Sequence, residues 1–272
     1  LFSIEDEDAE DEVRVGASPV QGMTLRSVLR GHTDWIARIA WSRDGRFLAS
    51  PSNDETIRIW DVERGECVAE LEGHNSGVWG IAWSPDGSRL ASGFADGTIR
   101  IWDVKTKKTM AEIKELKDTV FGVAWSPDGR SLASASIDGT INLFDTDKWK
   151  LENALKSENT GLSIAWSPDG DKIAACVYKN IHLFEVKSSD IKLLKRLEGH
   201  TGSVWNAIWS PDGGLLVSAS GDNTIKLWNG QTGQPLRTLE GHTGNVHCLS
   251  FSSDSSLLAS KGGDGVRLWR TD

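Results

Sequence analysis

The chain has 272 residues, of which 38% are hydrophobic and 25% are charged, and its formal net charge is -9. This is the composition of an ordinary soluble globular protein. The acidic balance argues against binding to nucleic acid or to an anionic membrane surface, because both need clustered Lys and Arg. No apolar run approaches the roughly 20 residues that span a bilayer, and no signal sequence opens the chain.

An acidic segment lies close to the N-terminus. Residues 5–12 hold seven of the 39 acidic side chains and no basic one, so the remaining chain carries 32 acidic against 30 basic residues. Runs of like charge repel themselves and stay disordered. We therefore expect an acidic disordered tail or linker over residues 1–23, either as a solubilising linker or as a docking strip for a basic partner. Because the chain begins with Leu1, we expect a fragment or a processed form, which leaves a flanking domain upstream of Leu1 open.

The three cysteines are Cys67, Cys176 and Cys248, which lie far apart and form no Cys-x-x-Cys pair. Their odd number and wide spacing indicate neither a disulfide framework nor a zinc site. Reduced thiols are typical of proteins inside the cell, so we expect a cytoplasmic location.

Three short motifs recur with a period of about 42 residues. The pair Gly-His occurs four times, and its first two copies, like its last two, are 42 residues apart. The phrase Trp-Ser-Pro-Asp-Gly begins at Trp83, Trp125, Trp166 and Trp209, with variants at Trp41 and Phe251. An aromatic residue, followed in three units by Asp, closes each unit, at Trp60, Trp102, Phe144, Phe184, Trp228 and Trp269. Six units therefore cover residues 24–272.

Each unit has the pattern of four short strands. In the second unit, residues 77–84, 88–94, 98–103 and 108–114 are strand-like, and Asp-Gly occurs in the turns that separate the first three of them. A four-stranded sheet of this size cannot bury both of its faces alone. Radial packing of such sheets buries each face against a neighbour, which predicts an all-β propeller.

The three motifs resemble those of the WD40-repeat family, over about nine-tenths of the chain, in a near-consensus form of prokaryotic or fungal type. The resemblance implies a propeller of four-stranded antiparallel blades. It also implies that a His, a Ser, an Asp and a Trp form a buried hydrogen-bonded tetrad in each regular blade. Carried over to this sequence, these tetrads are His32, Ser50, Asp54 and Trp60; His74, Ser92, Asp96 and Trp102; His200, Ser218, Asp222 and Trp228; and His242, Ser260, Asp264 and Trp269.

The third and fourth units depart from this pattern. Leu116 and Phe144 replace the His and the Trp in the third unit, and the fourth has Glu158, Ala175 and Phe184 at tetrad positions. We expect this sector to be the least rigid part of the ring.

The last unit ends after its third strand, near Trp269. Residues about 25–30 precede the first Gly-His in the same way that outer strands precede the later ones. We therefore expect these residues to complete the last blade and close a ring of six blades, which occupy residues about 31–272. A ring that is open or completed by a partner is the alternative.

One position in the innermost strand carries large apolar side chains. In the family it lies near the rim of the central channel, on a face that commonly binds partners. Aromatic residues are typical interface anchors, although the rings could instead fold inward and fill the channel. With Trp35 and Asn53 at its edge, the partner-binding set that we expect is Trp35, Asn53, Trp79, Phe121, Leu162, Trp205 and His247.

No motif for phosphate binding, for a catalytic nucleophile or for a metal is present in the sequence, so we expect no enzyme, no metal and no cofactor. The sequence favours a protein- or peptide-binding propeller, as a scaffold or as the sensor module of a larger signalling or assembly protein. We expect no nucleic-acid or membrane partner. Two alternatives stay open: a designed or consensus-like propeller without a natural partner, and a propeller enzyme with its site at the channel mouth.

Overall fold

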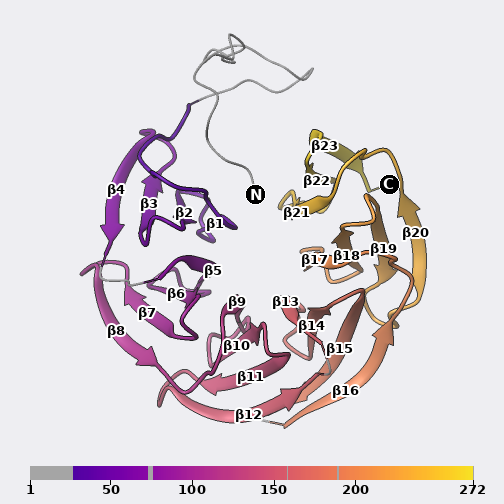
Figure 1. Ribbon diagram of the computed structural model, residues 1–272, viewed down its shortest axis with the longest axis horizontal. Coiled ribbons are helices and arrows are strands. Elements are labelled where there is room, and N and C mark those ends of the chain that lie inside the picture. The colour runs from indigo at the N-terminus through magenta and orange to yellow at the C-terminus, as the bar shows by residue number, and fades with distance from the viewer. Residues whose placement is uncertain (1–26, 73–75, 158, 189, 272) are drawn as a thin grey trace.

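The computed structural model describes residues 27–72, 76–157, 159–188 and 190–271, which form six antiparallel sheets arranged around a centre (Figure 1). Each sheet is one blade, and its strands follow one another in chain order from the centre outward. Five blades have four strands and the last has three. The predicted all-β propeller of six blades is therefore confirmed.

The strands of the first three blades are β1 (Ala40–Trp41), β2 (Phe47–Pro51), β3 (Ile57–Asp61) and β4 (Glu66–Leu71); β5 (Val78–Trp83), β6 (Arg89–Phe94), β7 (Ile99–Asp103) and β8 (Lys108–Ile113); and β9 (Val120–Trp125), β10 (Ser131–Ser136), β11 (Thr140–Asp145) and β12 (Lys150–Lys156). The strands of the last three are β13 (Gly161–Trp166), β14 (Lys172–Val177), β15 (Asn180–Lys187) and β16 (Asp190–Leu197); β17 (Val204–Trp209), β18 (Leu215–Ser220), β19 (Ile225–Asn229) and β20 (Pro235–Leu239); and β21 (Val246–Phe251), β22 (Leu257–Gly262) and β23 (Gly265–Arg270).

The Ser-Pro-Asp-Gly phrase makes the turn between the first two strands of a blade. In the second blade, the Ser84 hydroxyl donates to Asp86 at 2.6 Å and accepts the backbone N–H of Arg89 at 2.9 Å. The backbone N–H of Gly87 donates to the carbonyl of Ser84 at 2.9 Å, and Gly87 has a φ of 71°, which favours glycine. The phrase recurs because this closed set of hydrogen bonds fixes each hairpin.

The Trp that begins the phrase joins neighbouring blades. The indole N–H of Trp83 donates to the carbonyl of Ala40 at 3.0 Å, and that of Trp125 donates to Ala82 at 3.2 Å. Apolar side chains fill the space between the sheets, as where Ile57 and Leu90 share one cluster between the first two blades. The second, third and fourth blades are thus held by the blade before them, both by burial and by an indole hydrogen bond.

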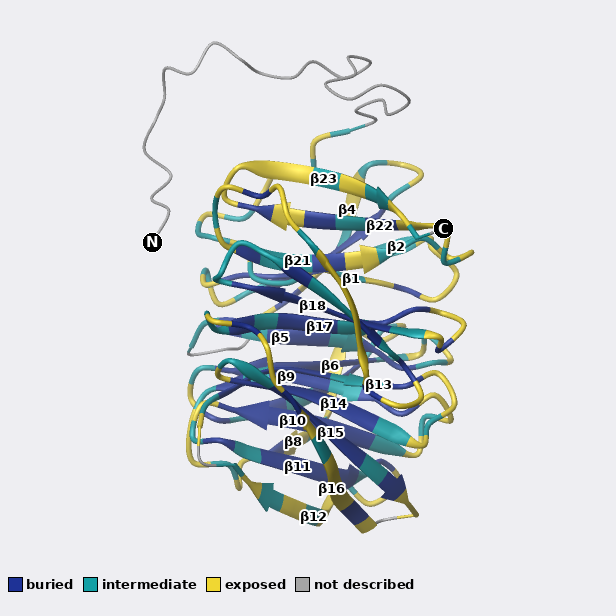
Figure 2. Cartoon of the chain, turned by 90° about the vertical axis from the view of Figure 1, so that its right-hand side faces the viewer, coloured by how far each residue is buried: buried dark blue, intermediate teal, exposed yellow. Residues whose placement is uncertain are grey.

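The last blade is more exposed than the others. The third strand is mostly buried in the first four blades, whereas β23 has only exposed and half-buried residues (Figure 2). Val266 is 60% exposed, and on the first blade, which ends the other side of the arc, Trp41 is 50% exposed. In the described chain, the outer edge of β23 pairs with no strand.

The expected closing strand lies partly outside the described residues. Its described part, residues 27–30, has no strand conformation, and Ser27 lies beside Gly65 of the first blade. Residues 25 and 26, like the acidic tail, fall outside the described ranges. Closure of the ring by this segment therefore stays a prediction.

Candidate functional site at the channel mouth

A β-bulge occurs at the same place in the innermost strand of five blades. The register between the first two strands shifts there, so that one residue of the inner strand has no partner across the ladder. A bulge of this kind bends the strand and turns its extra side chain away from the sheet. The residues at the five bulges are Trp79, Phe121, Leu162, Trp205 and His247.

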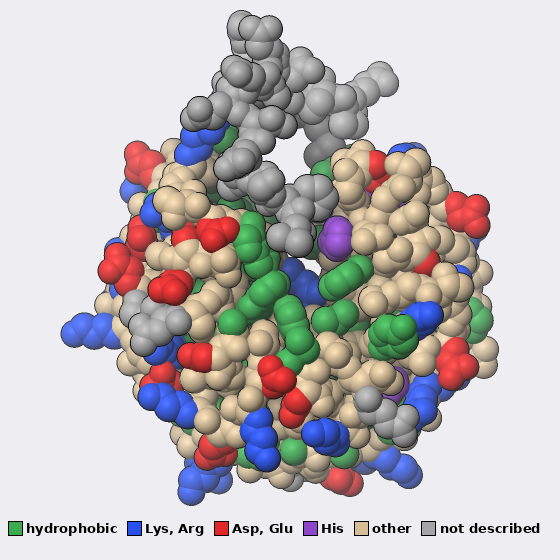
Figure 3. Space-filling model, viewed as in Figure 1, with side chains coloured by type: hydrophobic (Ala, Val, Ile, Leu, Met, Phe, Trp, Pro, Cys, Tyr) green, Lys and Arg blue, Asp and Glu red, His purple; other side chains and the backbone are tan. Residues whose placement is uncertain are grey.

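These side chains and Trp35 form the surface that we call the aromatic crescent. The rings of Trp35 and Trp79 meet edge to face with centroids 4.5 Å apart, and Trp79 meets Phe121 in the same way at 4.7 Å. Across the opening, the rings of Trp205 and His247 lie 5.5 Å apart. Figure 3 shows hydrophobic side chains gathered around the central opening, with a His at their side and a basic side chain within.

The aromatic members of the crescent are half-buried and Leu162 is buried. The rings pack on one another and still reach solvent. They are therefore neither fully exposed, as separate surface anchors would be, nor fully buried, as rings that fill the channel would be. Trp149, by contrast, precedes β12 and packs edge to face on Trp125 with centroids 5.8 Å apart. It lies on another part of the third blade and takes no part in the crescent.

Asn53 is exposed at the edge of the crescent and is held by the loop that carries Trp35. Its amide donates to Asp34 at 2.8 Å, and its backbone N–H donates to the carbonyl of Trp35 at 3.0 Å. Asn53 packs directly against Gly77 of the second blade. A Cβ at Gly77 would lie 2.5 Å from the Asn53 side-chain oxygen, so a larger residue at this position would clash with Asn53. Asn53 therefore fixes the Trp35 loop against the second blade.

Arg38 lies at the base of the crescent, and sequence reasoning did not single it out. Its guanidinium donates to the carbonyl of Leu162 at 3.1 Å and also to the carbonyl of Trp205, so it links the first blade to the fourth and fifth. The repeat alignment contains a sign of this role. The position after each bulge residue holds Gly80, Gly122, Ser163, Asn206 and Cys248 in the other blades, and Arg38 is the only long side chain in that series.

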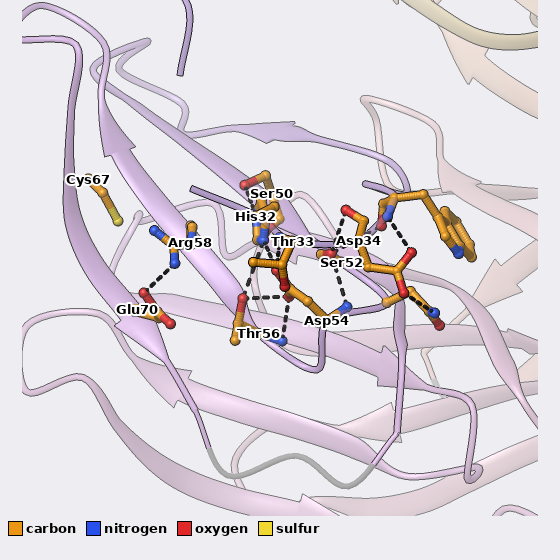
Figure 4. A network of polar contacts seen from close by, with 12 residues as sticks. His32, Thr33, Asp34, Ser50, Ser52, Asp54, Thr56, Arg58, Cys67 and Glu70 are labelled. Atoms are coloured by element: carbon orange, nitrogen blue, oxygen red, sulfur yellow. Dashed lines mark hydrogen bonds and ion pairs between the residues drawn. The ribbon is translucent and has the colours of Figure 1, made fainter. Parts of the chain in front are cut away.

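The expected tetrads have hydrogen-bonding geometry wherever their members are described. In the first blade, His32 Nδ1 lies 2.8 Å from Asp54, and His32 Nε2 lies 2.7 Å from the Ser50 hydroxyl (Figure 4). The indole Nε1 of Trp60 donates to the same hydroxyl at 2.8 Å. Thr56 and the backbone N–H of Thr33 add further hydrogen bonds to the Asp54 carboxylate. Each of the four tetrad side chains is thus hydrogen-bonded to another member of the set.

The same distances recur in the fifth and sixth blades. His200 lies 2.8 Å from Asp222 and 2.9 Å from Ser218, and Trp228 donates to Ser218 at 2.9 Å. In the sixth blade, His242 lies 2.5 Å from Asp264 and 2.7 Å from Ser260, which accepts the indole of Trp269 at 2.8 Å. In the second blade Trp102 donates to Ser92 at 2.9 Å, Asp96 accepts from the hydroxyl of Thr98 at 2.7 Å, and His74 lies outside the described residues.

The third and fourth blades use other contacts at these positions. Asn142 donates to Ser134 at 3.3 Å, and Leu116 packs beside the cluster that contains Phe144. In the fourth blade, Phe184 meets the ring of His182 edge to face with centroids 6.2 Å apart, and Ala175 is fully buried. Glu158 lies outside the described residues.

The tetrad environment shifts the pKa of its members. Burial by itself would raise the pKa of Asp54, but hydrogen bonds from Thr56, from the Thr33 backbone and from His32 outweigh it and hold that pKa at about 2. Burial lowers the pKa of His200 below its usual value, against the opposing effect of Asp222. In the fifth blade, a neutral His200 beside a charged Asp222 is therefore the state that the fold favours at neutral pH.

The described ranges contain neither a metal-binding cluster nor a membrane-spanning helix. No group of three or more His, Cys, Asp or Glu side chains there is arranged to hold a metal ion. Those residues also include no helix that is long and apolar enough to cross a membrane.

Comparison with known proteins assigns the repeats. The sequence model of the family described as "WD domain, G-beta repeat" matches residues 23–61, 65–103, 110–145, 191–229 and 233–270. These matches cover well over half of the chain. The segment between residues 145 and 191, which holds most of the irregular fourth unit, is not matched.

Similarity to individual curated proteins is limited to about one repeat. The chain is 44% identical over 41 residues to the probable E3 ubiquitin ligase complex SCF subunit sconB of Arthroderma otae, which is 15% of this chain and 6% of that protein. It is 42% identical over 62 residues to the periodic tryptophan protein 2 homolog of Neurospora crassa (21% and 7%). It is 49% identical over 39 residues to the probable cytosolic iron-sulfur protein assembly protein Ciao1 of Anopheles gambiae (14% and 11%). The chain thus spans about a tenth or less of the length of these relatives.

Proposed function

This chain belongs to the WD40-repeat family, and we propose that it is a non-enzymatic propeller that binds a protein or peptide segment at the aromatic crescent. In this role it is a scaffold or the sensor module of a larger signalling or assembly protein. The observation that carries the proposal is the series of five bulges, each of which turns a side chain toward the channel mouth. Four of the five bulge residues are large and apolar, and a contiguous apolar patch at a surface generally marks a binding site.

The chemistry of the crescent favours a protein partner over nucleic acid or a membrane. Half-buried indole and phenyl rings provide apolar contact area at little cost in conformational entropy, and Trp is enriched among interface anchors. The names of the relatives agree with a role in assemblies, since one is a subunit of an SCF complex and another is an iron-sulfur protein assembly protein. The word "cytosolic" in the second name also supports the cytoplasmic location that we propose.

The test is capture of partners from a lysate of the source cells by immobilised wild-type chain and by the Trp79→Ala, Trp205→Ala double variant. We expect capture to be abolished in the double variant, because both sides of the crescent lose their largest ring. Trp149→Ala is the matched control, since it removes an indole that lies away from the crescent. Melting temperatures of all three proteins show whether the fold is retained.

Two results would count against the proposal. Equal capture by the double variant and the wild type would exclude the crescent as the site. An empty capture by the wild-type chain would favour a propeller without a natural partner.

A further inference from the structure

Arg38 places a positive charge at the base of the crescent, and no side chain of the described residues forms an ion pair with it. The guanidinium of Arg38 has five N–H donors, and its bonds to the carbonyls of Leu162 and Trp205 use two of them. Both acceptors are backbone groups of crescent residues, so the charge lies directly beneath the apolar rings.

The neighbouring ionisable groups do not neutralise this charge. The thiols of Cys176 and Cys248 are the groups whose charge would act favourably on Arg38. Burial raises the pKa of Cys176 to about 12, so this thiol is uncharged at neutral pH. Burial also lowers the pKa of His247, and the nearby positive charges of Lys261 and Arg38 lower it further. This imidazole is therefore uncharged at neutral pH as well. The base of the crescent therefore carries the net charge of the guanidinium.

A half-buried cation with no counterion among the described residues is partly desolvated, which is unfavourable, and a carboxylate from outside would balance its charge. Arginine and carboxylate form paired, charge-assisted hydrogen bonds, which are stronger than hydrogen bonds between neutral groups. A carboxylate carries one negative charge, which one guanidinium balances. The crescent rings around Arg38 are apolar and half-buried, and a polar contact gains strength where the local dielectric constant is below that of water.

We propose that the channel mouth recognises a peptide segment in which a carboxylate lies next to a bulky apolar side chain. The carboxylate pairs with Arg38, and the apolar side chain packs between the rings of the crescent. This inference rests on the proposed function and adds the chemistry of the ligand to it. In this arrangement the rings of the crescent provide most of the binding affinity, and Arg38 provides the selectivity for acidic segments.

The first experiment is selection from a random library of 12-residue peptides displayed on phage, with the full chain as bait. We expect enriched peptides that carry Asp or Glu within two residues of Phe, Trp, Leu or Ile. Selection on Arg38→Gln should retain the apolar residue and lose the acidic one. Arg130→Gln is the matched control, because Arg130 is exposed and follows the turn between β9 and β10; it should select the same peptides as the wild type.

The second experiment needs no protein variant for its main comparison. An enriched peptide and its acid-to-amide counterpart, with Glu replaced by Gln or Asp by Asn, are titrated into the wild-type chain by calorimetry. We expect the amide to weaken binding about tenfold, as the loss of one charge-assisted contact predicts. The same titration with Trp79→Ala tests whether the peptide binds at the crescent.

The outcomes separate the two proposals. If the peptides bind through Trp79 but the amide binds as tightly as the acid, the carboxylate inference is wrong and the proposed function stands. If Trp79→Ala leaves binding unchanged, the crescent is not the site and both proposals fail. If the wild-type chain enriches no peptide, the proposed function fails, and the inference that rests on it fails too.

Discussion

The hydroxyl of Ser50 accepts the indole N–H of Trp60 at 2.8 Å, and this contact joins the second strand of the first blade to the third. The same hydroxyl lies 2.7 Å from His32 Nε2. With the Nδ1 proton of His32 donated to Asp54, Nε2 is placed to accept the proton of the Ser50 hydroxyl. One small side chain therefore satisfies two buried polar groups.

The substitution Ser50→Ala leaves both of these groups without a partner. We expect it to lower the free energy of unfolding by about 2–3 kcal/mol, the cost of buried polar groups that lose their hydrogen bonds. Urea denaturation of the full chain measures the change.

Ser134→Ala in the third blade is the matched control. Ser134 has only the long 3.3 Å contact with Asn142, and the residue at the Trp position is Phe144. We expect a loss below about 1 kcal/mol there. Equal losses at the two positions would show that the tetrad contributes no more than an isolated serine.

Acid should destabilise the protein in two ranges of pH. The pKa of His200 is lower in the fold than the usual 6.5, so the unfolded chain binds its proton first and stability falls as the pH drops below about 6.5. The pKa of Asp54 is lowered from 3.8 to about 2, so its contribution is present above pH 4 and is lost as the pH falls from about 4 to 2.

The urea midpoint, measured at a series of pH values from 8 to 2, checks both ranges. His200→Gln should flatten the upper range, and Asp54→Asn should reduce the loss in the lower one, each from a less stable starting point. A midpoint that is constant between pH 7 and 5 in the wild type would contradict the assignment to His200.

The repeat pattern was sufficient to predict the blades because each motif has a local physical cause. Ser84, Asp86 and Gly87 close their own turn with bonds over a few residues, so their spacing in the sequence predicts the hairpin. The bond from Trp83 to the Ala40 carbonyl, by contrast, joins residues 43 apart through the angle between two blades. That contact could be located only once the sheets were placed.

The crescent was predicted in part for a similar reason. When the six repeats are aligned, Trp79 and Trp205 differ from the residues at the same position in other repeats by their size and hydrophobicity, so the sequence alone identifies them. Arg38 stands out equally at the next position, but its bonds are to the carbonyls of Leu162 and Trp205, and a carbonyl has no sequence signature. Such a partner depends on how the ring is arranged, and the repeat alone does not reveal it.

Hydrogen exchange should be faster in the irregular sector than in the regular blades. The third strands β11 and β15 lack the indole-to-hydroxyl bond that ties β3 to β2 and β19 to β18. We expect amides of β11 and β15 to exchange about fivefold to tenfold faster, as the loss of one hydrogen bond of roughly 1 kcal/mol predicts. Mass spectrometry of the deuterated chain resolves the four strands, and uniform protection of all of them would refute the idea.

Closure of the ring can be tested by a designed disulfide. In the fifth blade, Leu227 of β19 pairs with Arg237 of β20, and the equivalent residues for a closed ring are Leu268 and Ser27. Facing residues of paired strands have Cβ atoms about 4.5–5.5 Å apart, close to the distance that a disulfide needs. We therefore expect Ser27→Cys with Leu268→Cys, in a Cys67→Ser background, to oxidise within one chain.

The matched control replaces Leu268→Cys by Ser256→Cys, which lies in the turn before β22 and away from the predicted pairing. Oxidation of the test pair alone, detected by mass spectrometry of a proteolytic digest, would show that the N-terminal segment reaches β23 and covers its open edge. The cross-linked chain should then melt at a higher temperature than its reduced form, because β23 gains a neighbour. Failure of the test pair to oxidise, while both cysteines remain reactive to a thiol reagent, would show that the segment stays away from β23 and that the last blade keeps three strands.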